Sequence, residues 1–486
     1  MSAGPTPTTT DEQTIVSAPG KVLLAGGYLV LDRLYTGLVV ATSSRFYCSV
    51  APGQAGIVTV RAGQFPADAS VWKYVAKVDN GKLDLQAEGD ERNKFVQTTL
   101  QTTLEYAAQR LEREGRASEL SAVLEKGLDI VVFADNDFYS QREQLAGAGL
   151  PLKVSSLDKL ERFTPLPRPL GKTNKTGLGS SAALVTSLVA ALLLHLGLAV
   201  LPTGQDTIHA LAQAAHCAAQ GKVGSGFDVA SAVYGTHVYR RFSPSVLEPM
   251  FAGTASLLDI VSGKWDQETR PFRLPRGLRL MLADVDAGTD TPSFVGQVLK
   301  WRKEKSEEAM RMWTVQDAAN KALEEALRGL AHLENEPGYT ETLQAAIGQE
   351  VANVSWEPMD TTDRQLDDFS PINAQLKHIR GAIEGVRKGM RDMSLASGVP
   401  IEPKEQTRLL DECSKLPGVL GGGVPGAGGY DAIWLLAIDD PSSLEGVERV
   451  WEGWTEMSVC PLSARQSDGG LQREQPEVLA AALARK

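Results

Sequence analysis

The most informative part of the sequence is a glycine- and serine-rich stretch in the middle of the chain, Lys175-Thr176-Gly177-Leu178-Gly179-Ser180-Ser181-Ala182-Ala183. An Ala- and Leu-rich run over residues 184–201 follows it and predicts a helix. The two glycines let the backbone turn tightly and approach a ligand without a Cβ in the way. Because the first N–H groups of a helix lack intrahelical partners and the helix dipole is positive there, this stretch predicts an anion site. The serine hydroxyls add groups that bind phosphate oxygens or a metal.

Size and composition indicate a globular protein of two domains. The chain has 486 residues, which exceeds one ordinary core, and 43% of them are hydrophobic. The net charge of −11 argues against a general affinity for nucleic acid or for an anionic membrane surface. The four cysteines are far apart and form no CxxC pair, so they indicate neither a zinc site nor a disulfide framework. They favour a reducing compartment.

The chain shows no pattern of a targeting or membrane segment. Residues 1–13 are Pro- and Thr-rich without an apolar core, which predicts a disordered lead and not a signal peptide. The apolar run over 182–201 is interrupted by Thr186, Ser187 and His195, so a buried core helix is favoured over a membrane span. We therefore expect a cytoplasmic protein without membrane or nucleic-acid partners.

The order of predicted elements favours an α+β protein. In the first half we expect strands over 15–20, 21–27, 38–50, 57–60 and 128–133, and helices over 95–116, 184–201, 206–219 and from Asp228. In the second half we expect strands over 278–283 and 433–438, a glycine loop over 421–429, and helices over 293–311, 315–334, 339–356, 368–395 and 404–416. Strands and helices without strict alternation are typical of this class. We divide the chain into domains 14–260 and 261–486.

The glycine loop by itself fits no standard nucleotide motif. A Walker A loop needs a glycine five residues before the Gly171-Lys172-Thr173 run, and that position holds Leu166. The spacing of Gly177, Gly179 and Ala182 fits a dinucleotide loop loosely, yet prolines and not a strand precede it. Alone, the glycines could equally cap a buried helix.

Four segments taken in order give a more specific signal. They are Pro19-Gly20-Lys21-Val22-Leu23-Leu24-Ala25-Gly26-Gly27-Tyr28, the glycine loop itself, Gly224-Ser225-Gly226-Phe227-Asp228 and Gly426-Ala427-Gly428-Gly429. This set resembles the GHMP kinases, the superfamily of galactokinase, homoserine kinase, mevalonate kinase and phosphomevalonate kinase. The resemblance covers about residues 15–440. It implies an N-terminal α/β domain like ribosomal protein S5 domain 2 and a C-terminal ferredoxin-like α+β domain with extra helices.

Within the superfamily the chain is most similar to the fungal-type phosphomevalonate kinases. The similarity rests on residues 26–32, 135–140 and 220–228. Mevalonate kinase and galactokinase typically have Glu-His where this chain has Gly27 and Tyr28. Mevalonate kinase also uses a magnesium-binding glutamate about a dozen residues before its catalytic Asp, a region that holds His216 to Ala219 here. The resemblance implies transfer of a phosphate from ATP, with Mg²⁺, to (R)-5-phosphomevalonate in the mevalonate pathway.

The resemblance also implies roles for particular residues. Lys21 would bridge the acceptor and the γ-phosphate, and Asp228 would orient Lys21 or the acceptor; these two are the expected catalytic residues. The ATP-binding residues would be Lys175, Thr176, Gly177, Leu178, Gly179, Ser180, Ser181 and Ala182, with Ser180 and Ser181 near the metal. The substrate-binding residues would be Lys21, Tyr28, Lys222, Ser225, Gly226, Ser293, Gly426, Ala427 and Gly428. Since the acceptor phosphate is already anionic, catalysis should rest on positioning and charge neutralisation.

Other interpretations of these residues stay open. Asp228 and Ser293 could be helix caps, Lys222 could be a surface lysine, and His209 and His216 are more often core or surface histidines than ligands. Mevalonate kinase, diphosphomevalonate decarboxylase and an inactive ligand sensor of the same fold are the alternative functions. The sequence leaves a monomer and a homodimer equally open.

Overall fold

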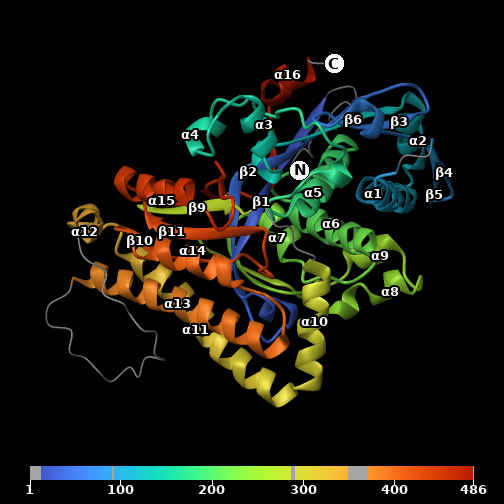
Figure 1. The fold of residues 1–486 in the computed structure, drawn as a ribbon. Coiled ribbons are helices and arrows are strands. Elements are labelled where there is room, and N and C mark those ends of the chain that lie inside the picture. The colour runs from blue at the N-terminus through green and yellow to red at the C-terminus, as the bar shows by residue number, and fades with distance from the viewer. Residues whose placement is uncertain (1–12, 90–91, 286–290, 348–369, 485–486) are drawn as a thin grey trace.

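The two longest strands form the centre of the first sheet. The computed structural model describes residues 13–89, 92–285, 291–347 and 370–484 (Figure 1). Strand β1 (Thr14–Ala25) is one continuous strand, so the prediction of two strands around a Pro-Gly bend was wrong. Its pairing with β2 (Gly37–Pro52) shifts register between Pro19 and Lys21, because a β-bulge absorbs the bend. The bulge lies directly before Lys21.

The first sheet joins both ends of the chain. The strand order is β14-β1-β2-β6-β3-β4-β5, with β7 and β13 also paired to β2 and β8 paired to β7. The other strands are β3 (Val58–Ala62), β4 (Val71–Asp79), β5 (Lys82–Glu88), β6 (Leu128–Ala134), β7 (His237–Arg240), β8 (Glu268–Pro271), β13 (Gln466–Ser467) and β14 (Gln472–Arg473). Since β13 and β14 return from the C-terminal end to this sheet, the division at 260/261 stays a prediction.

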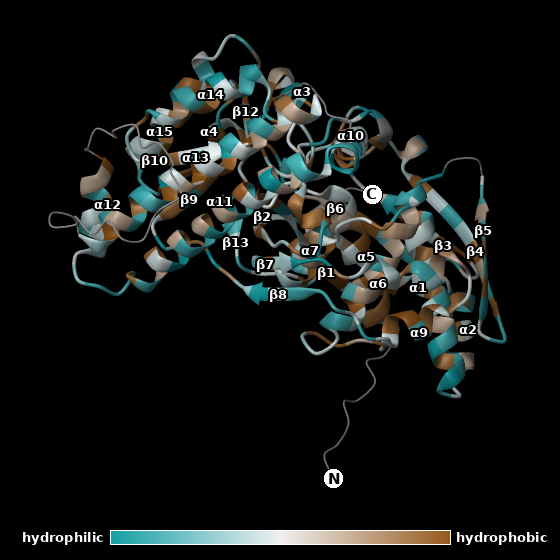
Figure 2. Ribbon diagram, turned by 90° about the horizontal axis from the view of Figure 1, so that it is seen from below, coloured by the Kyte–Doolittle hydropathy of each residue, from teal (hydrophilic) through white to brown (hydrophobic). Residues whose placement is uncertain are grey.

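Helix α5 (Ser180–His195) runs through the core beside the first sheet. Every residue from 182 to 195 is buried, which confirms the predicted core helix, although the helix ends at His195 and not at residue 201. Figure 2 shows apolar residues concentrated where α5 lies beside β1. In the part of the chain that the structure describes, none of the helices is both long and apolar enough to cross a membrane. The neighbouring helices are α1 (Lys94–Arg113), α2 (Ala117–Lys126), α3 (Arg142–Gly147), α4 (Val154–Leu157), α6 (Gln205–Gln220), α7 (Phe227–Tyr234), α8 (Glu248–Phe251) and α9 (Leu257–Ser262).

The second sheet is antiparallel, and helices cover it. Its strand order is β10-β11-β9-β12, from β9 (Leu278–Asp284), β10 (Val419–Gly423), β11 (Ala432–Ile438) and β12 (Cys460–Pro461). The long helices α11 and α13 lie side by side below it in Figure 1. The helices of this half are α10 (Thr291–Glu304), α11 (Ser306–His332), α12 (Tyr339–Ile347), α13 (Pro371–Ser397), α14 (Lys404–Ser414), α15 (Pro441–Gly453) and α16 (Glu477–Leu483).

Two expectations for this half were wrong. The break between the first two helices lies at Lys305 and not after residue 311, since Ala309 and Trp313 are buried on α11 together with its later residues. Residues 421–423 form the end of strand β10 and not a loop. Their lack of side chains permits this, because a Cβ on Gly421 would lie 2.8 Å from Ile383 Cγ2.

Some expected elements fall partly outside the described residues. They are the lead over residues 1–12, the last part of the helix expected over 339–356 and the first two residues of the helix expected over 368–395. The four cysteines lie inside the described ranges, and all of them are buried and outside any disulfide bond.

Candidate active site

The glycine loop turns into α5 through two left-handed residues. Gly177 has φ +78° and Gly179 has φ +79°, and Gly179 is the N-cap of the helix. The back of the loop is fixed by the hydroxyl of Thr176, which donates to the Asp137 carbonyl, and by the Lys21 N–H, which donates to the Leu178 carbonyl at 2.9 Å. The helix start is therefore held in place while Gly177 stays exposed.

Lys21 lies directly against this loop. Its Nζ donates to the Gly177 carbonyl at 2.8 Å and lies 5.6 Å from the centre of the Phe227 ring. A Cβ on Gly179 would lie 3.0 Å from Lys21 Cε, so the glycine makes room for the lysine. Burial lowers the pKa of Lys21, and the negative charges of Asp228 and Asp431 oppose that effect. The ammonium is placed between the glycine loop and α7.

Asp228 is in the first turn of α7 and is not its cap. The N-cap is Gly226, with φ +84°. Asp228 Oδ1 accepts the Val229 N–H at 2.9 Å, and Oδ2 lies 3.9 Å from His216 Nε2. The interpretation of Asp228 as a helix N-cap was therefore wrong. Its carboxylate is partly exposed, and its negative charge opposes the lowering of the Lys21 pKa by burial.

The loop before α7 is held through its carbonyl oxygens. Gln213 Nε2 donates to Gly226 O at 2.6 Å, the Tyr239 hydroxyl donates to Ser225 O at 2.9 Å, and Arg241 donates to Gly224 O at 2.8 Å. A Cβ on Gly226 would lie 2.7 Å from the Gln213 amide nitrogen. Each carbonyl therefore has a buried or half-buried donor, and the loop presents its other side to the site.

The first and last predicted segments pack against each other across the two halves. The Tyr28 hydroxyl donates to Ala427 O at 2.7 Å, and Tyr28 has φ +61°. A Cβ on Gly27 would lie 2.6 Å from Gly426 O, which leaves no room for the larger residue of related kinases. Gly428 is equally confined, since its Cβ would lie 2.1 Å from Ile401 O.

Comparisons with known proteins assign the chain to a family. Its residues 166–236 match the model of the GHMP kinase N-terminal domain, and residues 374–457 match that of the C-terminal domain. The chain is 39% identical to the phosphomevalonate kinase of Aspergillus fumigatus, over 91% of this chain and 90% of that one. It is 40% identical to the phosphomevalonate kinase of Gibberella zeae, over 90% of this chain and 91% of that one. It is 36% identical to the peroxisomal phosphomevalonate kinase of Arabidopsis thaliana, over 94% of this chain and 95% of that one. The chain belongs to the phosphomevalonate kinase family.

Solved structures agree with this fold. A Lin0012 protein from Listeria innocua gives a TM-score of 0.64 at 17% identity, covering 96% of this chain and 100% of that one. The Streptococcus pneumoniae phosphomevalonate kinase in complex with phosphomevalonate and AMPPNP gives 0.56 at 14% identity, covering 95% and 99%. The predicted family and the two-domain α+β class are confirmed.

Three predicted site residues of this phosphomevalonate kinase family member lie away from these contacts. Lys175 is exposed at the loop entrance. Lys222 is exposed just after α6, and its N–H donates to Cys217 O at 3.2 Å. Ser293 is exposed in the first turn of α10, and Gln297 donates to its hydroxyl at 3.1 Å. The residues 288–290 before it lie outside the described ranges, so its part in the site stays a prediction.

Two aspartates at the site were missed by the sequence analysis. Asp431 comes two residues after the Gly426–Gly429 segment, and its negative charge raises the pKa of Lys21 against the effect of burial. Asp137 is buried and accepts from the Ser44 hydroxyl at 2.5 Å and from the Ser463 N–H at 2.7 Å. Burial raises the pKa of Asp137, against these hydrogen bonds. Asp137 lies within residues 135–140, which served only as evidence of the family resemblance. Nothing in its spacing indicated that it contacts the glycine loop through Thr176.

The site offers hydroxyl oxygens and few carboxylates for a metal. Among the described residues, no group of three or more His, Cys, Asp or Glu side chains is placed to hold an ion. Magnesium prefers oxygen ligands, keeps several waters and takes the rest from substrate phosphates, so Ser180 and Ser181 at the helix start fit it. Ser181 Oγ lies 3.1 Å from His216 Nε2, and burial lowers the pKa of that histidine while Asp228 opposes the effect.

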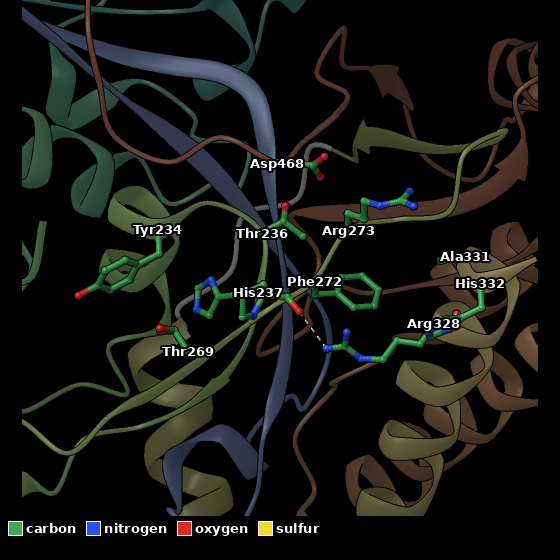
Figure 3. Close-up of a pocket in the computed structure, with 11 residues that line it drawn as sticks. Tyr234, Thr236, His237, Thr269, Phe272, Arg273, Arg328, Ala331, His332 and Asp468 are labelled. Atoms are coloured by element: carbon green, nitrogen blue, oxygen red, sulfur yellow. Dashed lines mark hydrogen bonds between the residues drawn. The ribbon is translucent and has the colours of Figure 1, made fainter. Parts of the chain in front are cut away.

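A separate cavity lies elsewhere and contains none of the predicted site residues. Its volume is about 700 Å³, and it lies between the β7–β8 pair and α11 (Figure 3). Arg328 donates to the Pro271 carbonyl at 3.1 Å across it. The lining residues are Tyr234, Thr236, His237, Thr269, Pro271, Phe272, Arg273, Arg328, Ala331, His332 and Asp468. Size alone therefore does not locate the candidate active site.

Proposed function

We propose that this chain transfers the γ-phosphate of ATP to the phosphate of (R)-5-phosphomevalonate, which gives ADP and (R)-5-diphosphomevalonate. One observation carries the proposal. The chain is 40% identical to a phosphomevalonate kinase over 90% of its length, and within it the Lys21 ammonium donates a hydrogen bond to the glycine loop. The Streptococcus structure of the same fold binds phosphomevalonate and AMPPNP, which supports this choice of substrates.

The reaction requires two polyanions to approach each other. Their repulsion is the main barrier that this chain must lower, because the acceptor oxygen is already a nucleophile at neutral pH. Lys21 supplies a positive charge beside the loop, and its fixed Nζ–Gly177 bond places that charge in advance. The negative charges of Asp228 and Asp431 oppose the lowering of the Lys21 pKa by burial. The proposed role of Asp228 is to orient Lys21 and the acceptor, and to take any residual acceptor proton.

The nucleotide phosphates are proposed to bind at the start of α5. The free N–H groups from Gly177 to Ala182 and the helix dipole attract them there. Lys175 and Thr176 flank this group, with Thr176 acting through its bond to Asp137. Bound Mg²⁺ would neutralise charge on the transferred phosphate, and the Ser180 and Ser181 hydroxyls would hold it.

The acceptor is proposed to bind on the opposite side of Lys21. Tyr28 and Ala427 are joined by a hydrogen bond, so this wall is formed by both halves of the chain. Ser225 and Gly226 form the wall at α7. The remaining proposed contacts are Lys222, Ser293, Gly426 and Gly428.

An ADP-release assay tests the function directly. Mevalonate, 5-phosphomevalonate and 5-diphosphomevalonate are offered separately with ATP and Mg²⁺. We expect turnover with 5-phosphomevalonate. Turnover with mevalonate only would refute the proposal in favour of mevalonate kinase, and ATP-dependent loss of CO₂ from 5-diphosphomevalonate would favour the decarboxylase. ATP binding without any turnover would favour an inactive sensor.

Cellular location, assembly and domain limits are further proposals, which do not concern the reaction itself. Four buried cysteines outside any disulfide bond support a cytoplasmic location, although one relative is named peroxisomal, and cell fractionation distinguishes the two. We propose small-molecule partners only, domains 14–260 and 261–486, and a monomer or homodimer. Light scattering determines the assembly, and expression of each half tests the domain limits.

A further inference from the structure

One histidine contacts the starts of two helices that carry the proposed chemistry. His216 lies near the end of α6, and the residue is 3% exposed. Its Nε2 lies 3.1 Å from Ser181 Oγ, at the start of α5, and 3.9 Å from Asp228 Oδ2, in the first turn of α7. The Gln220 amide lies 3.3 Å from the same nitrogen. A single ring atom therefore joins the phosphate-binding end of α5 to the expected catalytic aspartate.

The ring has little freedom to leave this position. On its far side the Phe95 ring of α1 packs against it at 5.9 Å between centroids. Ser181 and Gln220 hold its Nε2 edge. A side chain fixed by packing and by hydrogen bonds can hold the groups that it contacts to within the tolerance that catalysis needs.

The contacts of the ring argue against a role as a metal ligand. Mg²⁺ takes oxygen ligands and binds imidazole poorly. Moreover, Nε2 faces two groups that can donate to it, because the Gln220 amide nitrogen only donates and the Ser181 hydroxyl can also donate. This favours the tautomer whose Nε2 carries no proton. The Ser181 hydroxyl then donates to Nε2, and the lone pairs of its oxygen stay available to a metal ion.

We propose that His216 is a positioning residue for phosphoryl transfer, which orients the Ser181 hydroxyl at the start of α5 and packs beside the Asp228 carboxylate. The inference rests on the proposed function of this site. It gives the chain a histidine in the region where related kinases place a metal-binding glutamate. It also explains why a buried histidine faces polar groups of two different helices.

Substitutions of His216 that differ in reach test the proposal. The terminal amide of Gln reaches the place of Nε2, whereas that of Asn reaches only the place of Nδ1. We expect His216→Asn and His216→Ala to lower kcat by about tenfold or more, because small misplacements of reacting groups are costly. His216→Gln should restore kcat to within about threefold. The KM for ATP and the Kd for ADP, measured by calorimetry, should change by less than about threefold in each variant.

A control variant separates positioning from stability. His195 is buried at the opposite end of α5 and contacts Thr14. We expect His195→Gln to lower the melting temperature without lowering kcat. If His216→Gln and His216→Asn lose kcat equally, or if the loss follows melting temperature across all variants, the proposal is wrong.

A double-mutant cycle keeps the proposal testable if one variant does not fold. The effects of Ser181→Ala and of His216→Asn or His216→Ala on kcat should be less than additive, because both substitutions remove the same contact between His216 and Ser181. Additive effects would overturn the proposal. If the wild-type enzyme uses another acceptor, the proposed function fails, and the same series with that acceptor still decides the role of His216.

Discussion

Two glycines of one loop provide a matched pair for testing the placement of Lys21. Gly177 and Gly179 both have left-handed backbones, with φ of +78° and +79°. An alanine in that conformation costs about 1–2 kcal/mol, so both Gly→Ala variants should lose about that much unfolding free energy. A Cβ at Gly177 meets nothing within 4 Å, but one at Gly179 lies 3.0 Å from Lys21 Cε and 3.2 Å from Lys21 Cγ.

The catalytic effect should therefore differ between the two variants. In Gly179→Ala the lysine must move by a few tenths of an ångström, which disturbs the 2.8 Å bond from its Nζ to Gly177 O. A misplacement of about 1 Å costs about a hundredfold in rate. We therefore expect Gly179→Ala to lower kcat by about tenfold or more beyond the effect of Gly177→Ala.

Steady-state kinetics and urea unfolding of both variants check this reasoning. The two unfolding free energies should agree within about 0.5 kcal/mol, while the kcat values diverge. Equal kcat values would mean that strain in the loop, and not the position of Lys21, determines the rate. A lower kcat for Gly177→Ala than for Gly179→Ala would refute the reasoning altogether.

Three further predictions concern stability. Glu402 is fully buried and pairs with Arg387 at 2.8 Å, so Glu402→Ala should cost about 3–5 kcal/mol in urea unfolding; a cost under about 1 kcal/mol would contradict this. Burial lowers the pKa of His209 to about 3 and of His237 to about 4, from 6.5. Because the unfolded chain then binds more protons, unfolding free energy should fall as pH drops below 6.5, by about 2 kcal/mol per histidine at pH 5, and replacing either by Gln should flatten the profile. Asn93 caps α1 by accepting two N–H groups, so Asn93→Ala should cost about 1 kcal/mol, whereas Asn93→Asp should cost little.

Local patterns of the sequence predicted the helix after the glycine loop and its burial. Apolar residues around the whole of α5 leave no polar face, so its place in a core follows from composition alone. The order of four short segments identified the family. The helix break at Lys305 was missed because it depends on tertiary packing that buries Trp313 on α11. The strand over residues 421–423 was missed because it depends on the close packing of Gly421 against Ile383 of α13.

The sequence by itself determined which groups can bind phosphate and carry charge, because glycine conformations and helix starts are properties of a few consecutive residues. Only the tertiary structure determined which of these groups meet. Strand β1 lies against the glycine loop through two hydrogen bonds that Lys21 donates, and His216 of α6 lies beside Ser181 of α5 and Asp228 of α7. Such contacts join residues far apart in the chain, and no local pattern records the packing that brings them together.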